Sequence, residues 1–270
     1  LAGDDMDVCE NGSVQLSGQA TNYNSTTWLT TGDGTFDDSS VLNAIYTPGL
    51  GDIEVGTVEL ELLVEAIPPA TGSVSDNLTI TITSAPAADA GEDINICNNA
   101  TAQLVGIASS YESVAWNTDG DGEFSDSNLL EAIYTPGVGD ISAGQVVLNL
   151  VANAIDPCSE SSMDNLTVNI GVAPVANAGM DEITCGNMPF QLEGTAQDND
   201  GVEWNTSGDG VFNDVSILNP VYTPGSSDLI LGTVNLQLSA LAIDPCGTDS
   251  EDTMVLEIES MPDISAGDSS

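Results

Sequence analysis

The five cysteines are the residues of this sequence best suited to form covalent links, and no histidine, lysine or arginine accompanies them. Cys97 and Cys158 lie 61 residues apart, and Cys185 and Cys246 have the same separation. Equal separations predict one disulfide in each of two equivalent segments, Cys97–Cys158 and Cys185–Cys246, and an oxidising compartment. Closing so long a loop contributes about 4 kcal/mol in the chain-entropy model.

Cys9 breaks this pattern, because Ala70 stands where its partner would be. We expect Cys9 to be a free thiol, with an intermolecular disulfide as the alternative. A zinc site is not expected, since the chain has neither a CxxC spacing nor a histidine.

The carboxylates are the second group that could do chemistry, because hard cations such as Ca²⁺ take six to eight oxygen ligands. The candidate ligands lie in Gly-Asp-Gly triplets and a few residues after them: Asp33, Asp121, Asp209, Asp38, Asp126 and Asp214. Residues 117–128 mimic an EF-hand loop in part, but the twelfth position is Asn128 instead of Glu. The alternative is a hairpin turn whose Asp accepts backbone hydrogen bonds, and it is the simpler interpretation.

A second place for cations lies where each segment begins. Asp93 and Asp181 follow a proline connector, where a cation could bridge neighbouring domains. Solvated linker acids are the alternative. We therefore keep calcium as a possible ligand and expect no organic cofactor.

Glycosylation and catalysis are weakly indicated. Six Asn-x-Ser/Thr sequons are candidate glycosylation sites: Asn11, Asn24, Asn77, Asn99, Asn165 and Asn205. Chance alone would give a similar number, so the count itself indicates nothing.

There is no His or Lys for acid–base work, and accidental pairs of carboxylates are unavoidable among 43 acidic residues. We do not expect an enzyme.

The cysteines and the candidate carboxylates recur with a period of 88 residues, and so do Trp28, Trp116 and Trp204. A strict period without insertions indicates one folding unit copied in tandem. It predicts three domains, 1–86, 87–174 and 175–262. Residues 263–270 resemble the start of the chain, and we expect them to open a fourth repeat or to dock onto the next copy. Leu1 begins directly in repeat sequence, so we expect a processed or internal part of a longer protein.

Within each repeat the apolar residues alternate with polar ones. In Val58, Leu60 and Leu62 they alternate with Glu59 and Glu61, as in a strand with one buried face. Further strands are expected over 13–18, 26–31, 44–47 and 77–83, and no convincing helical period is found. Several short strands in 88 residues predict an all-β fold of three tandem Ig-like antiparallel β-sandwich domains arranged as a rod.

The charge limits the partners. The formal net charge is −43, so nucleic acid and anionic membranes would repel the chain. Yet 41% of the residues are hydrophobic, which disordered acidic chains lack. No apolar stretch is long enough to span a membrane, so we expect no direct membrane insertion.

The repeated string also resembles a known group of proteins. Repeat three reads Trp204, Gly208-Asp209-Gly210-Val211-Phe212, Tyr222-Thr223-Pro224-Gly225, Asp228, Gly232-Thr233-Val234-Asn235-Leu236-Gln237-Leu238 and Asp244-Pro245-Cys246. This is similar to the PKD-like, Ig-like tandem repeats of giant Bacteroidota cell-surface proteins, gliding-motility adhesins among them. The resemblance implies a bacterial cell-surface location, export by the type IX route, and a role in attachment or as a filament.

These observations predict an extracellular structural repeat protein, a fibre or stalk of end-to-end Ig-like domains. It would be stiffened by cations, glycosylated, and in contact with copies of itself or with further repeats. The alternative is a cell-surface adhesin that binds a glycan or an abiotic surface.

Overall fold

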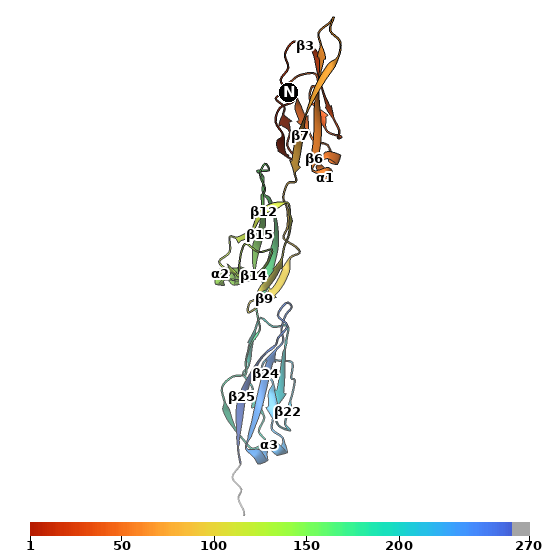
Figure 1. Ribbon diagram of the computed structural model, residues 1–270. Coiled ribbons are helices and arrows are strands. Elements are labelled where there is room, and N and C mark those ends of the chain that lie inside the picture. The colour runs from red at the N-terminus through yellow and green to blue at the C-terminus, as the bar shows by residue number, and fades with distance from the viewer. Residues whose placement is uncertain (261–270) are drawn as a thin grey trace, which may run out of the picture.

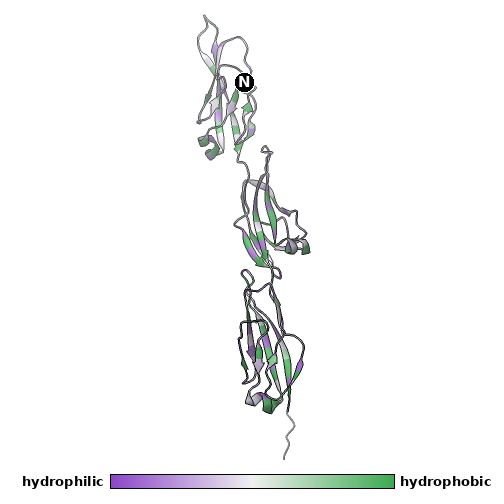
Figure 2. Ribbon diagram, turned by 180° about the vertical axis from the view of Figure 1, so that it is seen from behind, coloured by the Kyte–Doolittle hydropathy of each residue, from purple (hydrophilic) through white to green (hydrophobic). Residues whose placement is uncertain are grey.

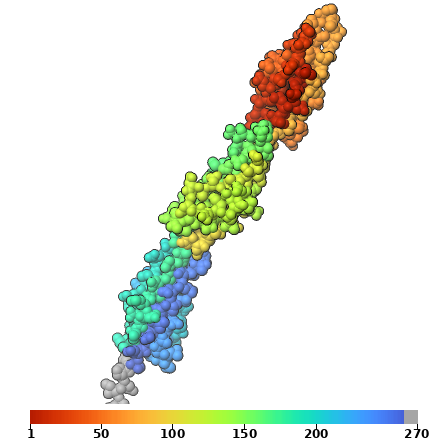
Figure 3. All heavy atoms as spheres, turned by 60° about the vertical axis from the view of Figure 1, so that its left-hand side comes forward, coloured from red at the N-terminus to blue at the C-terminus, as the bar shows by residue number. Residues whose placement is uncertain are grey.

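The computed structural model describes residues 1–260. Pro262 and the segment expected to open a fourth repeat lie outside the described residues. The three repeats follow one another end to end as separate bodies along one line (Figures 1 and 3).

The first repeat contains β1 (Met6–Cys9), β2 (Val14–Gln15), β3 (Tyr23–Thr30), β4 (Thr35–Phe36), β5 (Ile45–Thr47), α1 (Leu50–Val55), β6 (Thr57–Ala66) and β7 (Ser73–Thr83). The second contains β8 (Ala87–Asp89), β9 (Ile94–Cys97), β10 (Ala102–Val105), β11 (Ile107–Ser109), β12 (Tyr111–Thr118), β13 (Glu123–Phe124), β14 (Glu131–Thr135), α2 (Val138–Ala143), β15 (Gln145–Ala154) and β16 (Ser162–Gly171). The third contains β17 (Val175–Asn177), β18 (Glu182–Cys185), β19 (Phe190–Gln191), β20 (Thr195–Gln197), β21 (Val202–Thr206), β22 (Val211–Phe212), β23 (Val221–Thr223), α3 (Ser226–Leu231), β24 (Thr233–Ala240) and β25 (Ser250–Glu259).

Each repeat is a sandwich of two main sheets. The four-stranded sheets have the orders β1-β7-β6-β3, β9-β16-β15-β12 and β18-β25-β24-β21. The three-stranded sheets are β2-β5-β4, β10-β14-β13 and β19-β23-β22. The predicted all-β tandem sandwich is therefore confirmed, and every repeat has these two sheets. The second and third repeats also contain a two-stranded sheet, β8-β11 or β17-β20.

The alternation read from the sequence sets the orientation of the central strands. In β6, Val58, Leu60 and Leu62 are buried while Glu59 faces solvent. The same two-residue alternation of apolar and polar positions is visible along the strands in Figure 2. A one-residue shift in register would turn Glu59 into the core, so the pairing of this sheet is strongly specified.

Each repeat has its own core. Trp28, Trp116 and Trp204 belong to three separate clusters of buried residues. In the first repeat the Phe36 ring lies between two aromatic rings, with its centroid 6.4 Å from that of Trp28 and 5.0 Å from that of Tyr46. The recurring aromatic residues are thus core residues.

Two local expectations were incomplete. Each repeat contains a six-residue helix, α1, α2 or α3, which is too short to show a helical period. The sheets are also not wholly antiparallel, because the first strand of each four-stranded sheet pairs in parallel with the last strand of the repeat, as β1 does with β7. A chain whose first and last strands run in the same direction enters the domain at one end and leaves at the other. The next domain must then follow end to end.

Candidate functional site: acidic turns and domain junctions

The acidic turn of the first repeat joins two aspartates by reciprocal hydrogen bonds. The Asp33 carboxylate accepts the backbone N–H of Gly51 at 3.0 Å and of Asp52 at 3.1 Å. The Asp52 carboxylate accepts the backbone N–H of Asp33 at 3.1 Å and of Gly34 at 3.0 Å. Asp33 therefore satisfies free N–H groups at the start of α1, while Asp52 closes the Gly-Asp-Gly loop.

Asp52 is buried and has two further donors. The Tyr46 hydroxyl donates to it at 2.6 Å and the Gly49 N–H at 3.1 Å. A buried carboxylate without a cationic partner is tolerated only if its oxygens are hydrogen-bonded. Four donors meet that need here.

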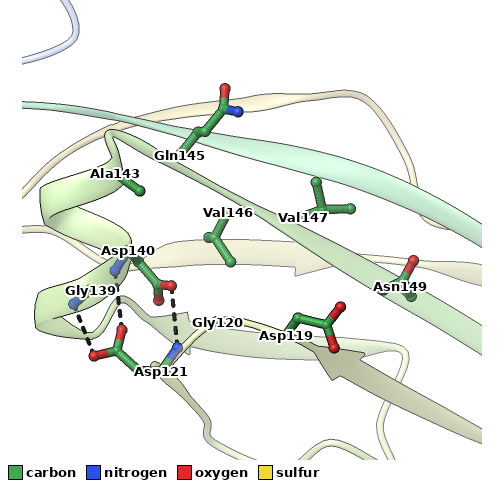
Figure 4. Close-up of a pocket in the computed structure, with 10 residues that line it drawn as sticks. All are labelled: Asp119, Gly120, Asp121, Gly139, Asp140, Ala143, Gln145, Val146, Val147 and Asn149. Atoms are coloured by element: carbon green, nitrogen blue, oxygen red, sulfur yellow. Dashed lines mark hydrogen bonds between the residues drawn. The ribbon is translucent and has the colours of Figure 1, made fainter.

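The other repeats contain the same pairing, between Asp121 and Asp140 and between Asp209 and Asp228. In the second repeat this turn lies at one side of a pocket, with the Gly139 and Asp140 N–H groups directed at Asp121 (Figure 4). Asp52, Asp140 and Asp228 are the buried acids of the described residues.

The environment shifts the pKa values of this turn. Burial opposes ionisation of Asp52, but the hydrogen bonds from Tyr46 and from backbone N–H groups outweigh it and hold its pKa below the usual range. Burial and the hydrogen bond to Asp52 raise the pKa of Tyr46 to about 12. Backbone N–H donors, Gly139 first, lower the pKa of Asp121.

The carboxylates predicted as metal ligands all have hydrogen-bond partners in their own repeat. Asp38 and Asp214 accept from Ser40 and Ser216, and Asp126 accepts from the Asn128 N–H at 2.9 Å. Asp93 accepts the Thr167 N–H at 2.7 Å, and Asp181 accepts the Val255 N–H at 2.8 Å. Over residues 1–260 no three His, Cys, Asp or Glu side chains are grouped so that they could hold a metal ion. The hydrogen bonds of Asp33, Asp121 and Asp209 are those of the turn in the alternative interpretation, and cation binding stays a prediction.

The candidate glycosylation residues are all exposed or partly exposed: Asn11, Asn24, Asn77, Asn99, Asn165 and Asn205. Asn11 and Asn99 lie two residues after Cys9 and Cys97, so glycans there would project beside the domain junctions. Their occupancy stays a prediction.

The predicted disulfides were wrong. The structure joins Cys9 to Cys158 and Cys97 to Cys246, each across 149 residues, so each bond links two consecutive repeats. Cys97–Cys158 and Cys185–Cys246 do not form. Cys9 is not free, and the free thiol among the described residues is Cys185, which is exposed.

The topology explains these pairings. The first cysteine of a repeat ends the first strand of the four-stranded sheet, as Cys9 does in β1, and so lies at the exit end of its sandwich, where Cys9 is beside Thr83 of β7. The second cysteine lies in the loop between the last two strands, as Cys158 does between β15 and β16, and so lies at the entry end. Two cysteines at opposite ends of one sandwich cannot approach to the 4.8 Å Cα separation of these disulfides.

The junctions are built from two recurring turns. The exit turn is closed by a backbone hydrogen bond from Gly12, Ala100 or Met188 to the carbonyl of Cys9, Cys97 or Cys185. The entry turn is closed by a bond from Ala70, Cys158 or Cys246 to the carbonyl of Ile67, Ile155 or Ile243. Cys185 and Ala70 therefore occupy the same local backbone as the bonded cysteines.

Electrostatics gives a reason for covalent junctions. One groove at the first junction is lined by Asp7 and Ala85 from the first repeat and by Pro157 and Glu160 from the second. Acidic residues face the groove from both sides, and the chain has no Lys or Arg to pair with them. A disulfide holds the surfaces together against that repulsion.

Two features of this site were missed from the sequence. Asp52 and its equivalents follow the glycine of Tyr-Thr-Pro-Gly by three residues, the spacing of an acidic capping residue at a helix start. Ala70 was a signal against pairing within each repeat, because the first repeat has the first cysteine, Cys9, but no second one.

No protein-family model matches this sequence, and no curated protein matches it. Many solved structures match this chain at low identity. Mouse Cadherin-23 EC22-24 is 13% identical, with 95% of this chain and 96% of that chain covered and a TM-score of 0.44. Mouse Protocadherin-24 EC1-3 is 10% identical, with 94% and 96% covered and a TM-score of 0.44. Drosophila OTK extracellular domains 3-5 are 11% identical, with 95% and 94% covered and a TM-score of 0.41. With identities of 10–13% and TM-scores of 0.41–0.44, these similarities support no conclusion about this chain.

No helix among the described elements has the length and apolar character needed to cross a bilayer.

Proposed function

We propose that this protein is an extracellular structural repeat protein that forms a stalk or fibre of sandwich domains held end to end. The observation that carries this proposal is the equivalent pair of disulfides, Cys9–Cys158 and Cys97–Cys246, each joining consecutive repeats. A disulfide within one domain stabilises that domain only, whereas these bonds fix the direction of one domain against the next.

Each junction is thereby connected twice. The chain crosses the first junction through Pro86, whose fixed φ limits the conformations that the connector can adopt. The Cys9–Cys158 bond crosses the same junction a second time. At the second junction the loop of the third repeat approaches the second closely, so that a Cβ at Gly171 would lie 2.7 Å from Pro245 Cδ. Two covalent connections and a close contact oppose bending.

Disulfides also support an extracellular or otherwise oxidising location, because they form and persist in such compartments. We further propose the domain boundaries 1–86, 87–174 and 175–262, and a Bacteroidota-type surface protein that is secreted by the type IX route. Cations bound by the acidic surface would stiffen the rod by relieving repulsion among its 43 acidic residues.

Small-angle X-ray scattering and electron microscopy of the oxidised and reduced chain test the stalk. We expect a straight particle with a narrow spread of bend angles when oxidised. The double variant Cys9→Ser/Cys158→Ser should bend at the first junction alone, while Cys185→Ser, which removes an unpaired thiol, should be unchanged. A bend distribution that does not respond to reduction would contradict the proposal.

The alternative function, adhesion to a glycan or abiotic surface, has little support from the exposed side chains. Across residues 1–260 Tyr23 is the one aromatic among the exposed large hydrophobic residues. Aromatic side chains supply most of the contact energy in many recognition surfaces. Binding of the chain to a glycan array would favour this alternative.

A further inference from the structure

The positions of the two disulfides determine which parts of the chain carry tension. At the first junction the second repeat is attached to the first through residue 87 and through Cys158. At the second junction it is attached to the third through Cys97 and through residue 174. Tension therefore enters the second repeat at two points and leaves it at two others.

Two short segments join these points directly. Residues 87–97 run from the connector to Cys97, and residues 158–174 run from Cys158 to the next connector. The ten residues of β16 span about 33 Å in the second segment, and residues 87–89 and 94–97 of the first segment are the strands β8 and β9. Neither segment can lengthen much under load.

The two segments also lie side by side. β9 pairs in parallel with the end of β16, from Ile94 opposite Val168 to Cys97 opposite Gly171. Closer to the entry end, the Ala90 N–H donates to Asp164 at 2.8 Å. The two segments, together called the band, thus lie side by side along the repeat, paired as strands from Ile94 to Cys97 and joined nearer the entry end by backbone-to-side-chain hydrogen bonds.

We propose that the interdomain disulfides divert pulling force into this band and so keep the rest of each sandwich out of the load path. Residues 98–157, which contain Trp116 and Tyr134 of the core, run from Cys97 to Cys158. The band and the neighbouring folded repeats already connect these two cysteines. If this region unfolds while its neighbours remain folded, the rod gains no length. This inference rests on the proposed structural function and adds that the fibre bears tension.

The end repeats are bypassed in the same way. Residues 1–9 cross the first repeat and pass the load to Cys158 through Cys9, so residues 10–85 can unfold without lengthening the rod while the second repeat stays folded. In the third repeat the load enters at Cys246 and leaves along β25, bypassing residues 175–245. With both disulfides closed, only the unfolding of all three repeats lets the chain lengthen.

Pulling the full chain by its two ends in optical tweezers tests the inference. Without disulfides, each repeat should release its whole length, a step of about 250–300 Å at roughly 3.5 Å per residue. We expect three such steps after reduction and none in the oxidised chain. Cys185→Ser should behave as the unmodified chain does in both states.

Single-bond variants make the test sharper, because the middle repeat is bypassed by either bond alone. Cys9→Ser/Cys158→Ser leaves Cys97–Cys246, which protects the second and third repeats, so one whole-repeat step is expected, from the first. Cys97→Ser/Cys246→Ser leaves Cys9–Cys158, and the one step should then come from the third repeat. Two steps in either variant would overturn the inference.

The result separates this inference from the proposed function. Bonds within repeats, Cys97–Cys158 and Cys185–Cys246, would give one whole-repeat step and two short ones in the oxidised chain, which would overturn the diverted load path. A chain that is straight in solution but shows whole-repeat steps when oxidised would contradict the proposed load path and would still agree with the proposed stalk function.

Discussion

Asp33 and Asp52 bind each other's backbone, each carboxylate accepting the N–H of the other residue at 3.1 Å. This exchange connects the Gly-Asp-Gly loop to the start of α1 without any positive charge. Asp52→Asn keeps the size of the side chain but replaces one acceptor oxygen by a donor that faces N–H groups. We expect a loss of about 1–3 kcal/mol in the stability of the first repeat, measured by calorimetry. Glu54→Gln is the matched control, since it removes one charge from an exposed position on the same helix. Equal effects of the two changes would show that charge alone matters.

The position before the turn aspartate requires glycine, because there is no room for a side chain. A Cβ at Gly208 would overlap the Asp228 carboxylate and lie 2.9 Å from a Val234 methyl group. We expect Gly208→Ala to destabilise the third repeat by roughly 1–3 kcal/mol, as overpacked sites do. At Gly247, in the same repeat, a Cβ would have no atom within 4 Å. Gly247→Ala should therefore leave urea unfolding unchanged, and similar midpoints for the two variants would contradict the steric explanation.

The pKa shifts predict loss of stability at both extremes of pH. The lowered pKa of Asp52 contributes stability that is present above the ordinary Asp pKa of about 3.9 and is lost as pH falls through the lower folded value. The Tyr46 pKa is raised to about 12, so its contribution is present below the ordinary Tyr pKa of about 10 and is lost as pH rises toward about 12. Circular dichroism followed through this alkaline range measures the loss of stability at high pH. Tyr46→Phe should reduce this loss in the first repeat, and an unaltered alkaline transition would refute its assignment to Tyr46.

The matching turns at the two ends of the chain predict that it can be linked head to tail. Ala70 occupies the entry turn and Cys185 the exit turn. In Ala70→Cys, with oxidised glutathione as the disulfide oxidant, the Cys185 thiolate would form a mixed disulfide and release one glutathione thiol. Attack by the thiolate introduced at position 70 of a second chain would release the other. We expect a ladder of multimers on non-reducing gels, with the 70–185 linkage in its peptide map. Ser73→Cys, an exposed position on the same loop side, should not form the ladder, and equal ladders would show random oxidation.

Cations should stabilise this chain through its net charge of −43. Added NaCl should raise the melting temperature by screening repulsion. We expect a further rise with millimolar Ca²⁺ at constant ionic strength if carboxylates bind it. Identical melting curves in EDTA and in Ca²⁺ would show that calcium does not stabilise this protein.

The repeat and its core could be predicted because they depend on local patterns. Alternation such as that of Val58, Leu60 and Leu62 fixes which face of a strand is buried, and the recurring Trp and Tyr marked the interior. The helix α1 could not be predicted from periodicity, because six residues contain fewer than two turns.

The disulfides could not be predicted from spacing alone. A fixed period makes the separation of Cys97 from Cys158 and that of Cys9 from Cys158 equally regular, so both pairings repeat perfectly. What decides between them is the end of the sandwich at which each cysteine lies. That depends on the parallel pairing of the outer strand with the last strand, as β9 pairs with β16, which links residues far apart in the chain, such as Ile94 and Val168.

The staggered disulfides also change what a protease can achieve. A single cut of the backbone anywhere between Cys9 and Cys246 falls inside at least one of the two bridged spans, 9–158 and 97–246. A disulfide then holds the two fragments together, and the cut molecule keeps its end-to-end length. Surviving a nick is thus a property of the cross-linking pattern, and it adds to the absence of any Lys or Arg at which trypsin could cut.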